Sequence, residues 1–435
     1  MPIRKPRLDP PFNVVRASHV ELTVTDLARS RAFYVDCLGY LVSDEDSGAL
    51  YLRAVEERNH HSIVLRKGAQ ASALTLGFKV GSEEDIDKAA AWFRARNLPV
   101  SFPKVAYQGR TLRTTDPHGM SVDFYFRMDQ RERMLQHYKA YQGARIQRID
   151  HINCFTPDVQ ASYDFYTEIG FRLTEYTETD DADPKLWAVW LHRKGNVHDL
   201  AFTNGRGPRL HHIGVWTASS LDILHICDVM ATCGYLPNME RGPGRHGISN
   251  AFFLYIRDPD GHRIELFTSD YLTVDPDLEP LRWSLTDPQR QTLWGHPAPK
   301  SWFEEGSEFA SVPVRDPALD DVRAITAMSA AMASSCDVSG AAHLPAHIAF
   351  RFGGLESTQA TTALRLEGVA PSVKHRKETL IALLQSYGSV TSLGAERSRL
   401  LWSSIRDVRP FAANGPSGQR PVWRVSTVPS KGAEF

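Results

Sequence analysis

The sequence predicts an α+β protein built from two copies of a β-α-β-β-β module, each forming an open barrel, followed by a small α+β extension. Strand-like runs and helical segments alternate in the same order twice before residue 275. Residues 16–19 (RASH) match residues 148–151 (RIDH), and residues 116–119 (DPHG) match residues 258–261 (DPDG). Matches at fixed spacing indicate a duplicated module.

In the first copy, the alternating residues 19–24 predict a strand, and Asp26 can cap the helix that follows. Gly39 suits the left-handed exit of that helix. A second helix is expected at residues 83–96, before a hairpin that turns at 116–119. Three short strands between the helices are predicted at 49–54, 61–66 and 74–80.

In the second copy, the most informative stretch is a predicted hairpin with strands at 251–256 and 264–267. Its turn is Asp258-Pro259-Asp260-Gly261, where proline fixes φ and glycine tolerates a positive φ. Alternation along the second strand directs Glu265 toward an interior. A buried carboxylate requires a cation or a proton, because an unpaired buried charge is too costly.

Two histidines can meet that carboxylate on a metal ion. His151 and His212 each lie near the start of a strand-like run. Two imidazoles and one carboxylate on one face leave three coordination positions open, as in non-haem Fe(II) oxygenases. The first copy has His19, about Thr75, and Asp123 at these places, so we expect one metal, in the second copy. Strand alternation places His211 on the opposite face from His212, in a structural role.

The bulk composition excludes several classes of protein. A formal net charge of -1 provides no basic surface for nucleic acid or a membrane. The five cysteines form no CxxC pair, which argues against a disulfide framework or a thiolate zinc site and fits a reducing cytoplasm. No apolar run is long enough for a membrane helix, and the start lacks the apolar core of a signal peptide.

The chain is expected to divide into four parts. These are the metal-free module at 14–130, the catalytic module at 146–275, a pocket-closing segment at 276–308, and a tail at 309–435 joined through a linker near 304–314. The tail predicts an alanine-rich helix over 320–342, a helix over 372–387 and a closing strand at 422–425.

The hairpin also carries a family resemblance. Residues 246–255, together with Asp258-Pro259, Gly261 and Glu265, resemble the signature of the type I extradiol ring-cleaving dioxygenases. These belong to the vicinal oxygen chelate superfamily, which is glyoxalase/bleomycin resistance-like, and residues 14–306 share the resemblance. Residues 190–194 (WLHRK), 197–199 (VHD) and 240–247 (ERGPGRHG) are similar to the homoprotocatechuate (3,4-dihydroxyphenylacetate) 2,3-dioxygenase subgroup.

The resemblance implies extradiol cleavage of a catechol by O₂ in aromatic degradation. The substrate would be 3,4-dihydroxyphenylacetate and the product 5-carboxymethyl-2-hydroxymuconate semialdehyde. It implies Fe(II), or Mn(II) in some members, and a homotetramer, while the cysteines indicate a cytoplasmic location. The ligands would be His151, His212 and Glu265. The implied second-sphere acid/base is His198, Tyr255 and Asn153 would bind the substrate's oxygens, and Trp190, His246 and Trp302 would line the pocket. Arg241 would bind the substrate carboxylate, but Gln291, next to Arg290, stands where the subgroup has a second arginine.

The tail has a separate resemblance. Residues 334–345 (SSCDVSGAAHLP) and 364–376 (LRLEGVAPSVKHR) are similar to the later portion of the FAD-binding subunit of glycolate oxidase. The glycine-rich flavin-binding half of that family is absent, so no FAD is expected.

Three alternatives stay open. The protein could act as a catechol 2,3-dioxygenase on another substituted catechol, or bind aromatic compounds without catalysis because the fused tail prevents turnover. A glyoxalase-type isomerase is a further alternative, although that chemistry requires a ligand set with more carboxylates.

Overall fold

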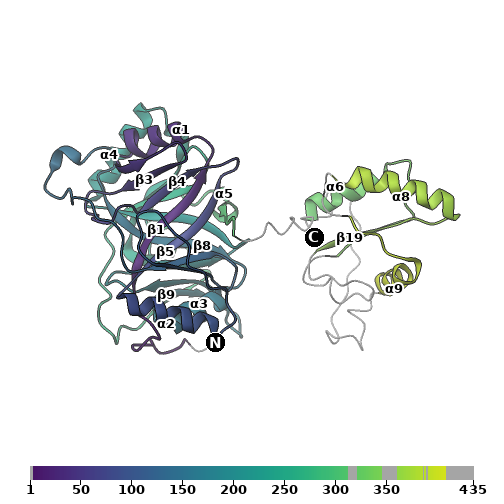
Figure 1. Cartoon of the computed structure of the whole chain (residues 1–435), viewed down its shortest axis with the longest axis horizontal. Helices are drawn as coiled ribbons and strands as arrows, with labels where there is room; N and C mark the ends of the chain where they lie inside the picture. The colour runs from purple at the N-terminus through teal and green to yellow at the C-terminus, as the bar shows by residue number, and fades with distance from the viewer. Residues whose placement is uncertain (1–2, 312–320, 345–359, 386, 388–389, 408–435) are drawn as a thin grey trace. The chain divides into compact units, whose positions relative to one another are not determined.

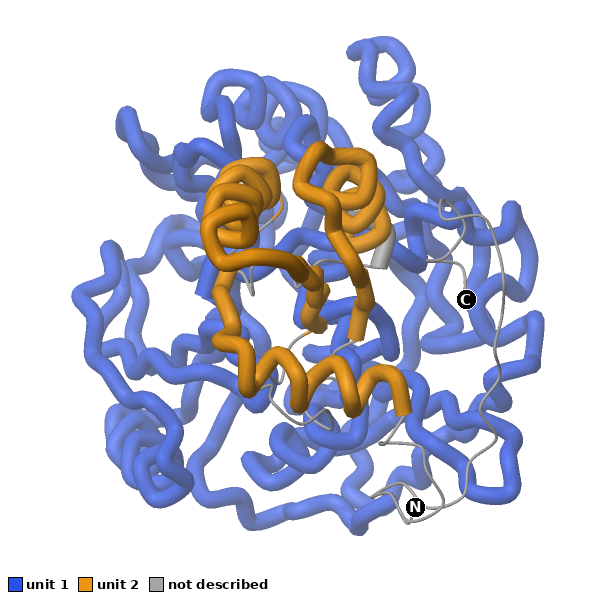
Figure 2. Tube along the Cα trace, turned by 90° about the vertical axis from the view of Figure 1, so that its right-hand side faces the viewer, with its two compact units in different colours: residues 1–312 blue, residues 313–435 orange. Residues whose placement is uncertain are grey.

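The computed structural model describes residues 3–311, 321–344, 360–385, 387 and 390–407. The chain divides into two compact units, Met1–Val312 and Pro313–Phe435 (Figures 1 and 2). Each unit is described by itself.

The first module of unit 1 is a seven-stranded open sheet, in the order β2-β3-β4-β1-β5-β7-β6, with two helical segments. Its strand β2 was not predicted. The elements are β1 (Val14–Val24), α1 (Leu27–Arg31), the π-helix η1 (Ala32–Cys37), β2 (Leu41–Glu45), β3 (Ala49–Arg53), β4 (Ile63–Lys67), β5 (Ser72–Val80), α2 (Glu83–Arg94), β6 (Thr111–Thr115) and β7 (Ser121–Tyr125).

The second module repeats this order as β9-β10-β11-β8-β12-β15-β14 and adds β13 and β16 at the two edges. The tandem α+β architecture expected from the sequence is therefore confirmed. The elements are η2 (Tyr138–Ala140), β8 (Ile146–Thr156), α3 (Val159–Glu168), β9 (Arg172–Glu178), β10 (Leu186–His192), β11 (Leu200–Asn204), β12 (Arg209–Thr217), α4 (Ser220–Thr232), η3 (Leu236–Asn238), β13 (Met239–Arg245), η4 (Ile248–Asn250), β14 (Phe252–Arg257), β15 (Arg263–Thr268), β16 (Leu281–Ser284), α5 (Lys300–Glu304) and β17 (Ser307–Glu308).

The two sheets also share their register. His19 on β1 pairs with Gly77 on β5, and His151 on β8 pairs with Gly214 on β12. Each glycine lies in turn beside a carboxylate of the next strand, Asp123 in the first module and Glu265 in the second. The duplication seen in the sequence therefore holds residue by residue at the centre of both sheets.

The modules are joined through their interiors. One continuous apolar core contains buried residues of both. Each module also supplies a carboxylate to the first strand of the other. The Ala17 amide donates to Asp199 Oδ1 (2.8 Å), and the Ile149 amide, at the equivalent position, donates to Glu57 Oε1 (2.8 Å). The acceptor of each of these amides therefore belongs to the other module.

The first unit extends past the boundary expected at residue 309. Phe309 is 2% exposed and belongs to the core, where it forms a parallel bridge with Ala73. The Ala310 amide donates to the Ala73 carbonyl (2.9 Å). Phe309 is therefore part of the first unit, since its aromatic side chain fills the first module, and the division after Val312 lies within the linker expected near 304–314.

In unit 2, the described residues form three helices and a two-stranded sheet: α6 (Asp321–Met332), β18 (Gly340–Leu344), β19 (Thr361–Arg365), α8 (Ala370–Leu384) and α9 (Ala395–Arg406). The helix expected over 320–342 ends at Met332, because the residues from Gly340 pair with β19. Helix α9 was not predicted. The strand expected at 422–425 lies outside the described residues.

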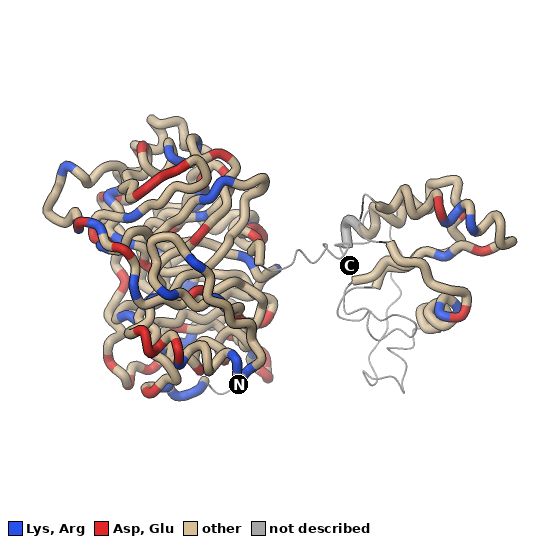
Figure 3. The backbone as a smooth tube through the Cα atoms, in the orientation of Figure 1, with Lys and Arg blue, Asp and Glu red and all other residues tan. Residues whose placement is uncertain are grey.

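Among the described helices, none has both the length and the apolar character required to cross a membrane. Basic and acidic residues are interspersed along the first unit (Figure 3).

Candidate metal centre and pocket

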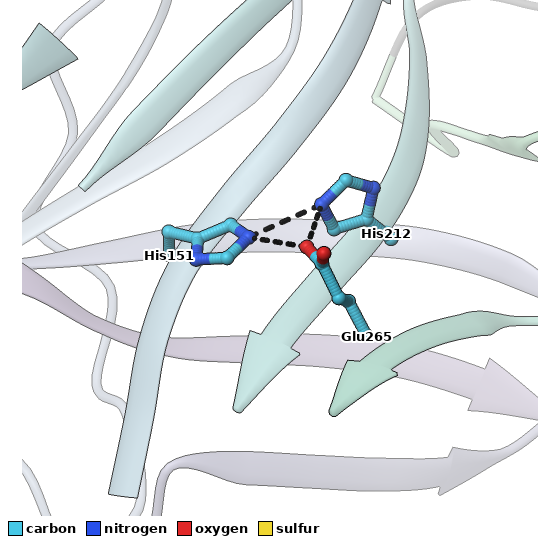
Figure 4. A group of neighbouring side chains, drawn as sticks. All are labelled: His151, His212 and Glu265. Atoms are coloured by element: carbon cyan, nitrogen blue, oxygen red, sulfur yellow. Dashed lines mark hydrogen bonds and ion pairs between the residues drawn. The ribbon is translucent and has the colours of Figure 1, made fainter. Parts of the chain in front are cut away.

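Three side chains from three adjacent strands meet inside the second module (Figure 4). His151 Nε2 lies 3.2 Å from His212 Nε2 and 3.0 Å from Glu265 Oε2, and His212 Nε2 lies 3.1 Å from that oxygen. All three residues are at most 4% exposed. In the described part of the chain, this is the single group of three or more metal-ligating side chains.

The neighbouring backbone makes room for this group. A Cβ on Gly214 would lie 2.1 Å from His151 Cε1, so any other residue there would displace the imidazole. Since Gly214 stands directly between His151 and Glu265 in the strand pairing, its missing side chain lets the ring cross toward the carboxylate.

The spacing of the three donor atoms suits a divalent metal ion. Two ligands at right angles on an ion about 2.1 Å away lie about 3.0 Å apart, whereas tetrahedral ligands lie about 3.4 Å apart. The observed separations of 3.0 to 3.2 Å match three ligands on one octahedral face. Among the described residues, no lysine or arginine forms an ion pair with Glu265.

The charges of the three groups are strongly coupled. Burial would raise the pKa of Glu265, but His151, His212 and His246 hold it well below its usual range. Burial would lower the pKa of His151, but Asp150 and Glu265 raise it to about 9. Burial lowers the pKa of His212 to about 4 despite Glu265. Without metal, a proton on His151 therefore balances the carboxylate, and a cation that binds here must displace that proton.

A second layer of polar residues orients His151. Its Nδ1 donates to Asp150 Oδ2 (3.1 Å), which leaves the Nε2 lone pair directed at the other ligands. Asn196 Nδ2 donates to both oxygens of Asp150 (2.9 and 3.1 Å). The sequence reasoning missed both residues. Asp150 directly precedes the ligand, and adjacency of an acid to a candidate ligand is the signal that could have identified it.

The expected orientation of His211 is wrong. Its Nδ1 lies 2.6 Å from His212 Nδ1, so the two side chains are in contact instead of on opposite faces. The reason is a β-bulge: Leu210 pairs with Cys154 and His212 with Asn153, which leaves His211 without a partner on β8. Asp150 is the extra residue of a second bulge, between Ile149 and His151.

A pocket adjoins the three ligands, with about 560 Å³ of empty space when the open solvent at its mouth is included. Several buried polar atoms around it have no hydrogen-bond partner in the described residues. They include Asn153 Oδ1, His198 Nδ1 and Trp302 Nε1. Of the residues predicted for the site, the pocket is lined by His151, His212, Glu265, Asn153, His198, Tyr255, His246, Trp190, Trp302, Arg290 and Gln291.

His198 lies directly against a ligand. Its ring centroid is 4.0 Å from that of His151, and its side chain is buried. Burial, His151 and Lys194 lower its pKa well below the ordinary value, so the ring is neutral and can accept a proton. Lys194 Nζ donates to the carbonyls of Asp150 (2.5 Å) and His198 (2.7 Å), which ties the loop of His198 to the ligand strand.

Tyr255 and His246 lie on the other side of the group. Tyr255 pairs with Glu265 across β14 and β15, and its hydroxyl is 3.0 Å from His246 Nε2. His246 Nδ1 donates to the Gln291 carbonyl. His246 Nε2 is therefore unprotonated in the neutral ring and accepts a hydrogen bond from the Tyr255 hydroxyl.

Arg241 is not among the residues that line the pocket, but its guanidinium packs on the aromatic rings of two residues that do. Its guanidinium is 4.8 Å from the Trp302 ring and 5.7 Å from the Tyr255 ring. Its Nη2 donates to the Gln291 carbonyl (3.0 Å) and Thr292 Oγ1 (2.7 Å), while Nε and Nη1 are buried with no partner in the described residues. A buried cation with unused donors is suited to an anionic group.

The equivalent positions of the first module hold no such group. Asp123 accepts two bonds from Arg113, at 2.7 and 2.8 Å. Thr75 donates to Ser121 Oγ (2.7 Å). An arginine thus neutralises the carboxylate there.

A family model, the glyoxalase/bleomycin resistance protein/dioxygenase superfamily, matches residues 16–124 and 148–266. A manganese-dependent 2,3-dihydroxybiphenyl 1,2-dioxygenase of Geobacillus genomosp. 3 is 29% identical over 66% of this chain and 95% of its own length. A metapyrocatechase of Geobacillus stearothermophilus is 28% identical over 71% of this chain and 98% of its own.

Solved structures give closer matches. The homoprotocatechuate 2,3-dioxygenase of Brevibacterium fuscum is 43% identical, with a TM-score of 0.66, over 70% of this chain and 96% of that one. The enzyme of the same name from Arthrobacter globiformis is 40% identical, with a TM-score of 0.67, over 70% and 95%. The internal repeat, the strand register that the two modules share and the matches to known proteins all agree. The chain belongs to the glyoxalase/bleomycin resistance protein/dioxygenase superfamily.

Proposed function

We propose that the protein is an extradiol dioxygenase that cleaves a catechol ring with O₂ at a divalent metal, Fe(II) or, as the alternative, Mn(II). The observation that carries the proposal is the group of three metal-ligating side chains, His151, His212 and Glu265. They lie beside a pocket in which several buried polar atoms have no hydrogen-bond partner among the described residues. Three protein ligands leave room for two catechol oxygens and O₂. Relatives named for extradiol substrates support it.

A bound divalent ion would acidify the catechol and hold the ring next to O₂. The chain's own residues then do the rest. Asn153 and Tyr255 present polar atoms to the pocket beside the ligands and hold the substrate oxygens. Trp190 and Trp302 wall the ring and exclude water. Holding two reactants in one orientation removes up to about 7 to 11 kcal/mol of an entropic barrier.

His198 is the acid/base of the proposal. Because it is neutral and buried against His151, its ring can take the proton of the second catechol hydroxyl. The ring nitrogen that takes this proton returns it later in the reaction, so His198 is unchanged over one turnover. Lys194 fixes the backbone of His198 relative to the ligand strand and so sets where that proton is held.

The proposed substrate is 3,4-dihydroxyphenylacetate, which gives 5-carboxymethyl-2-hydroxymuconate semialdehyde. The Brevibacterium fuscum relative was crystallised with this compound. Arg241 and Arg290 are the cations for its carboxylate, since each has a buried guanidinium nitrogen without a partner in the described residues. Gln291 supplies no charge, so the second cation comes from Arg290 beside it.

The test is an aerobic assay of the chelator-treated chain reloaded with Fe(II) or Mn(II). Uptake of O₂ with a yellow product from 3,4-dihydroxyphenylacetate supports the proposal, and the faster metal is assigned as the cofactor. Binding of the catechol with no O₂ uptake contradicts it. If residues 1–312 then turn over where the full chain does not, the tail is the inhibitor.

The presence of Gln291 favours a second candidate, cleavage of an uncharged catechol, as the metapyrocatechase name suggests. Arg241→Ala separates the two. We expect the KM for 3,4-dihydroxyphenylacetate to rise about 10- to 100-fold, since a bond to a charged group contributes about 1.5 to 3 kcal/mol, with little change for catechol. Equal changes for both compounds remove Arg241 from carboxylate binding.

A further inference from the structure

The residue before His212 has a contact that the proposed function does not use. His211 is 1% exposed and occupies the bulge on β12. Its Nε2 lies 2.8 Å from the backbone carbonyl of Trp302, and its Nδ1 lies 2.6 Å from His212 Nδ1. Rings of Phe155 and Trp302 pack on it at 4.5 and 4.6 Å.

These two contacts determine which nitrogens carry protons. A carbonyl oxygen only accepts, so His211 Nε2 must donate and carries the hydrogen. A second hydrogen on His211 Nδ1 would collide with the one on His212 Nδ1, or leave His212 deprotonated there with its hydrogen on the ligand nitrogen. The arrangement that keeps the ligand nitrogen free has His211 Nδ1 bare and accepting from His212 Nδ1. His212 Nε2 then offers its lone pair to the metal.

We propose that His211 is a positioning residue. Its Nε2 donates to the Trp302 carbonyl, which leaves Nδ1 as an acceptor, and this acceptor holds His212 in the tautomer that binds metal. The inference rests on the metal centre of the proposed function and deepens it. It also links the ligand to α5, whose Trp302 walls the pocket. Arg263 reinforces the link, because its Nη1 donates to the carbonyls of His211 and Glu305 (both 3.0 Å).

Two substitutions separate the two ends of His211. In His211→Asn, the amide oxygen takes the place of Nδ1 and still accepts from His212. In His211→Gln, the amide nitrogen takes the place of Nε2 and still donates to Trp302, while the acceptor for His212 is lost. Side-chain size alone predicts the opposite order, because asparagine is smaller than glutamine and leaves the larger cavity.

The experiment titrates chelator-treated full-length chains with Mn(II) and follows free Mn(II) by electron paramagnetic resonance. We expect His211→Asn to keep the Kd within about 3-fold, and His211→Gln and His211→Phe to weaken binding about 10- to 100-fold, as is typical for partners of metal-binding histidines. Parallel pH titrations of the Kd detect the proton that a wrong tautomer must release.

His262→Asn and His262→Gln are the matched controls. His262 is equally buried and also bonds at both nitrogens, to Ser307 Oγ and the Thr23 carbonyl, but touches no ligand. These variants should lower the melting temperature of the metal-free chain and leave the Mn(II) Kd unchanged. Equal Kd values for His211→Asn and His211→Gln overturn the inference. Absence of tight Mn(II) binding in the unmodified chain overturns the proposed function as well.

Discussion

The two modules of unit 1 have the same strand order and register, yet one assembles a metal-binding face and the other does not. Asp123 and Glu265 occupy equivalent positions, and so do Arg113 and Tyr255, which pair with them across the hairpin. The arginine supplies the positive charge in the first module. In the second, the tyrosine leaves the carboxylate without a permanent cation.

The bulges teach the same lesson. Both modules carry one extra, bulged residue directly before each of two equivalent positions. These positions are His151 and His212 in the second module and His19 and Thr75 in the first. In the second module the extra residues are Asp150 and His211, which bond to the ligands. In the first they are Ser18 and Leu74. The backbone therefore provides the geometry in both copies, and side-chain chemistry decides which copy binds metal.

The largest expected effect comes from His212→Ala. Removing one of three ligands should reduce metal content and ring cleavage to background, because two donors hold a divalent ion poorly. Thr75→Ala, at the equivalent position of the first module, is the control and should keep both. Metal analysis after gel filtration measures the difference. Full metal retention in the His212 variant would mean that the ion binds elsewhere.

His198→Asn should keep the metal and slow turnover about 10²- to 10⁴-fold, the usual contribution of a general acid/base. His61 occupies the equivalent register position and lies 5.2 Å from His19, ring to ring. His61→Asn is therefore the control and should leave turnover unchanged. Single-turnover kinetics with premixed catechol separates the proton-transfer step from substrate binding. An unaffected rate in the His198 variant rules out its acid/base role.

Arg113→Ala tests whether the arginine does in the first module what a metal does in the second. Asp123 is fully buried, so removing its partner should cost about 3 kcal/mol of unfolding free energy. Adding Asp123→Asn in the same chain should restore most of the loss, because no charge is then left unpaired. Denaturant unfolding measures both. A single variant as stable as the parent would show that the charge is solvated.

The smallest expected effect concerns the hairpin turns. Burial raises the pKa of Asp116 to about 7, and its Oδ2 has no partner in the described residues. In the second module, Asp258 accepts from Tyr34 (3.1 Å). The folded state keeps the Asp116 proton that the unfolded state releases near pH 4, so stability falls as pH rises from about 4 to 7.

Asp116→Asn should remove that fall. It should match the parent near pH 5 and be the more stable of the two at pH 8, because the asparagine never acquires the charge that burial penalises in the parent. Asp258→Asn should gain less, because it loses a hydrogen bond from Tyr34. Thermal melts at the two pH values measure the contrast. Identical pH profiles for parent and variant would place the Asp116 pKa in its usual range.

The sequence was sufficient for the repeat, the hairpin and the three converging side chains, because each depends on alternation, turn chemistry or fixed spacing. It was insufficient for His211. A bulge shifts the face of a strand by one residue, and only the pairing with β8 reveals it. Strand β13 was also missed, since Gly242, Pro243 and Gly244 disfavour a strand until a hairpin edge is present to pair with. Arg113 was missed because the register of the predicted hairpin, which pairs Arg113 with Asp123, was not worked out.

Two hydrogen bonds cross between the modules, from the Ala17 amide to Asp199 and from the Ile149 amide to Glu57. They bear on how the duplicated chain arose. In an isolated module, the amide would lack its carboxylate acceptor and the carboxylate would lack its amide donor. In two identical modules related by a twofold axis, the carboxylate of each would accept from the amide of the other. A homodimer of one such half is thus a workable forerunner of the duplicated chain.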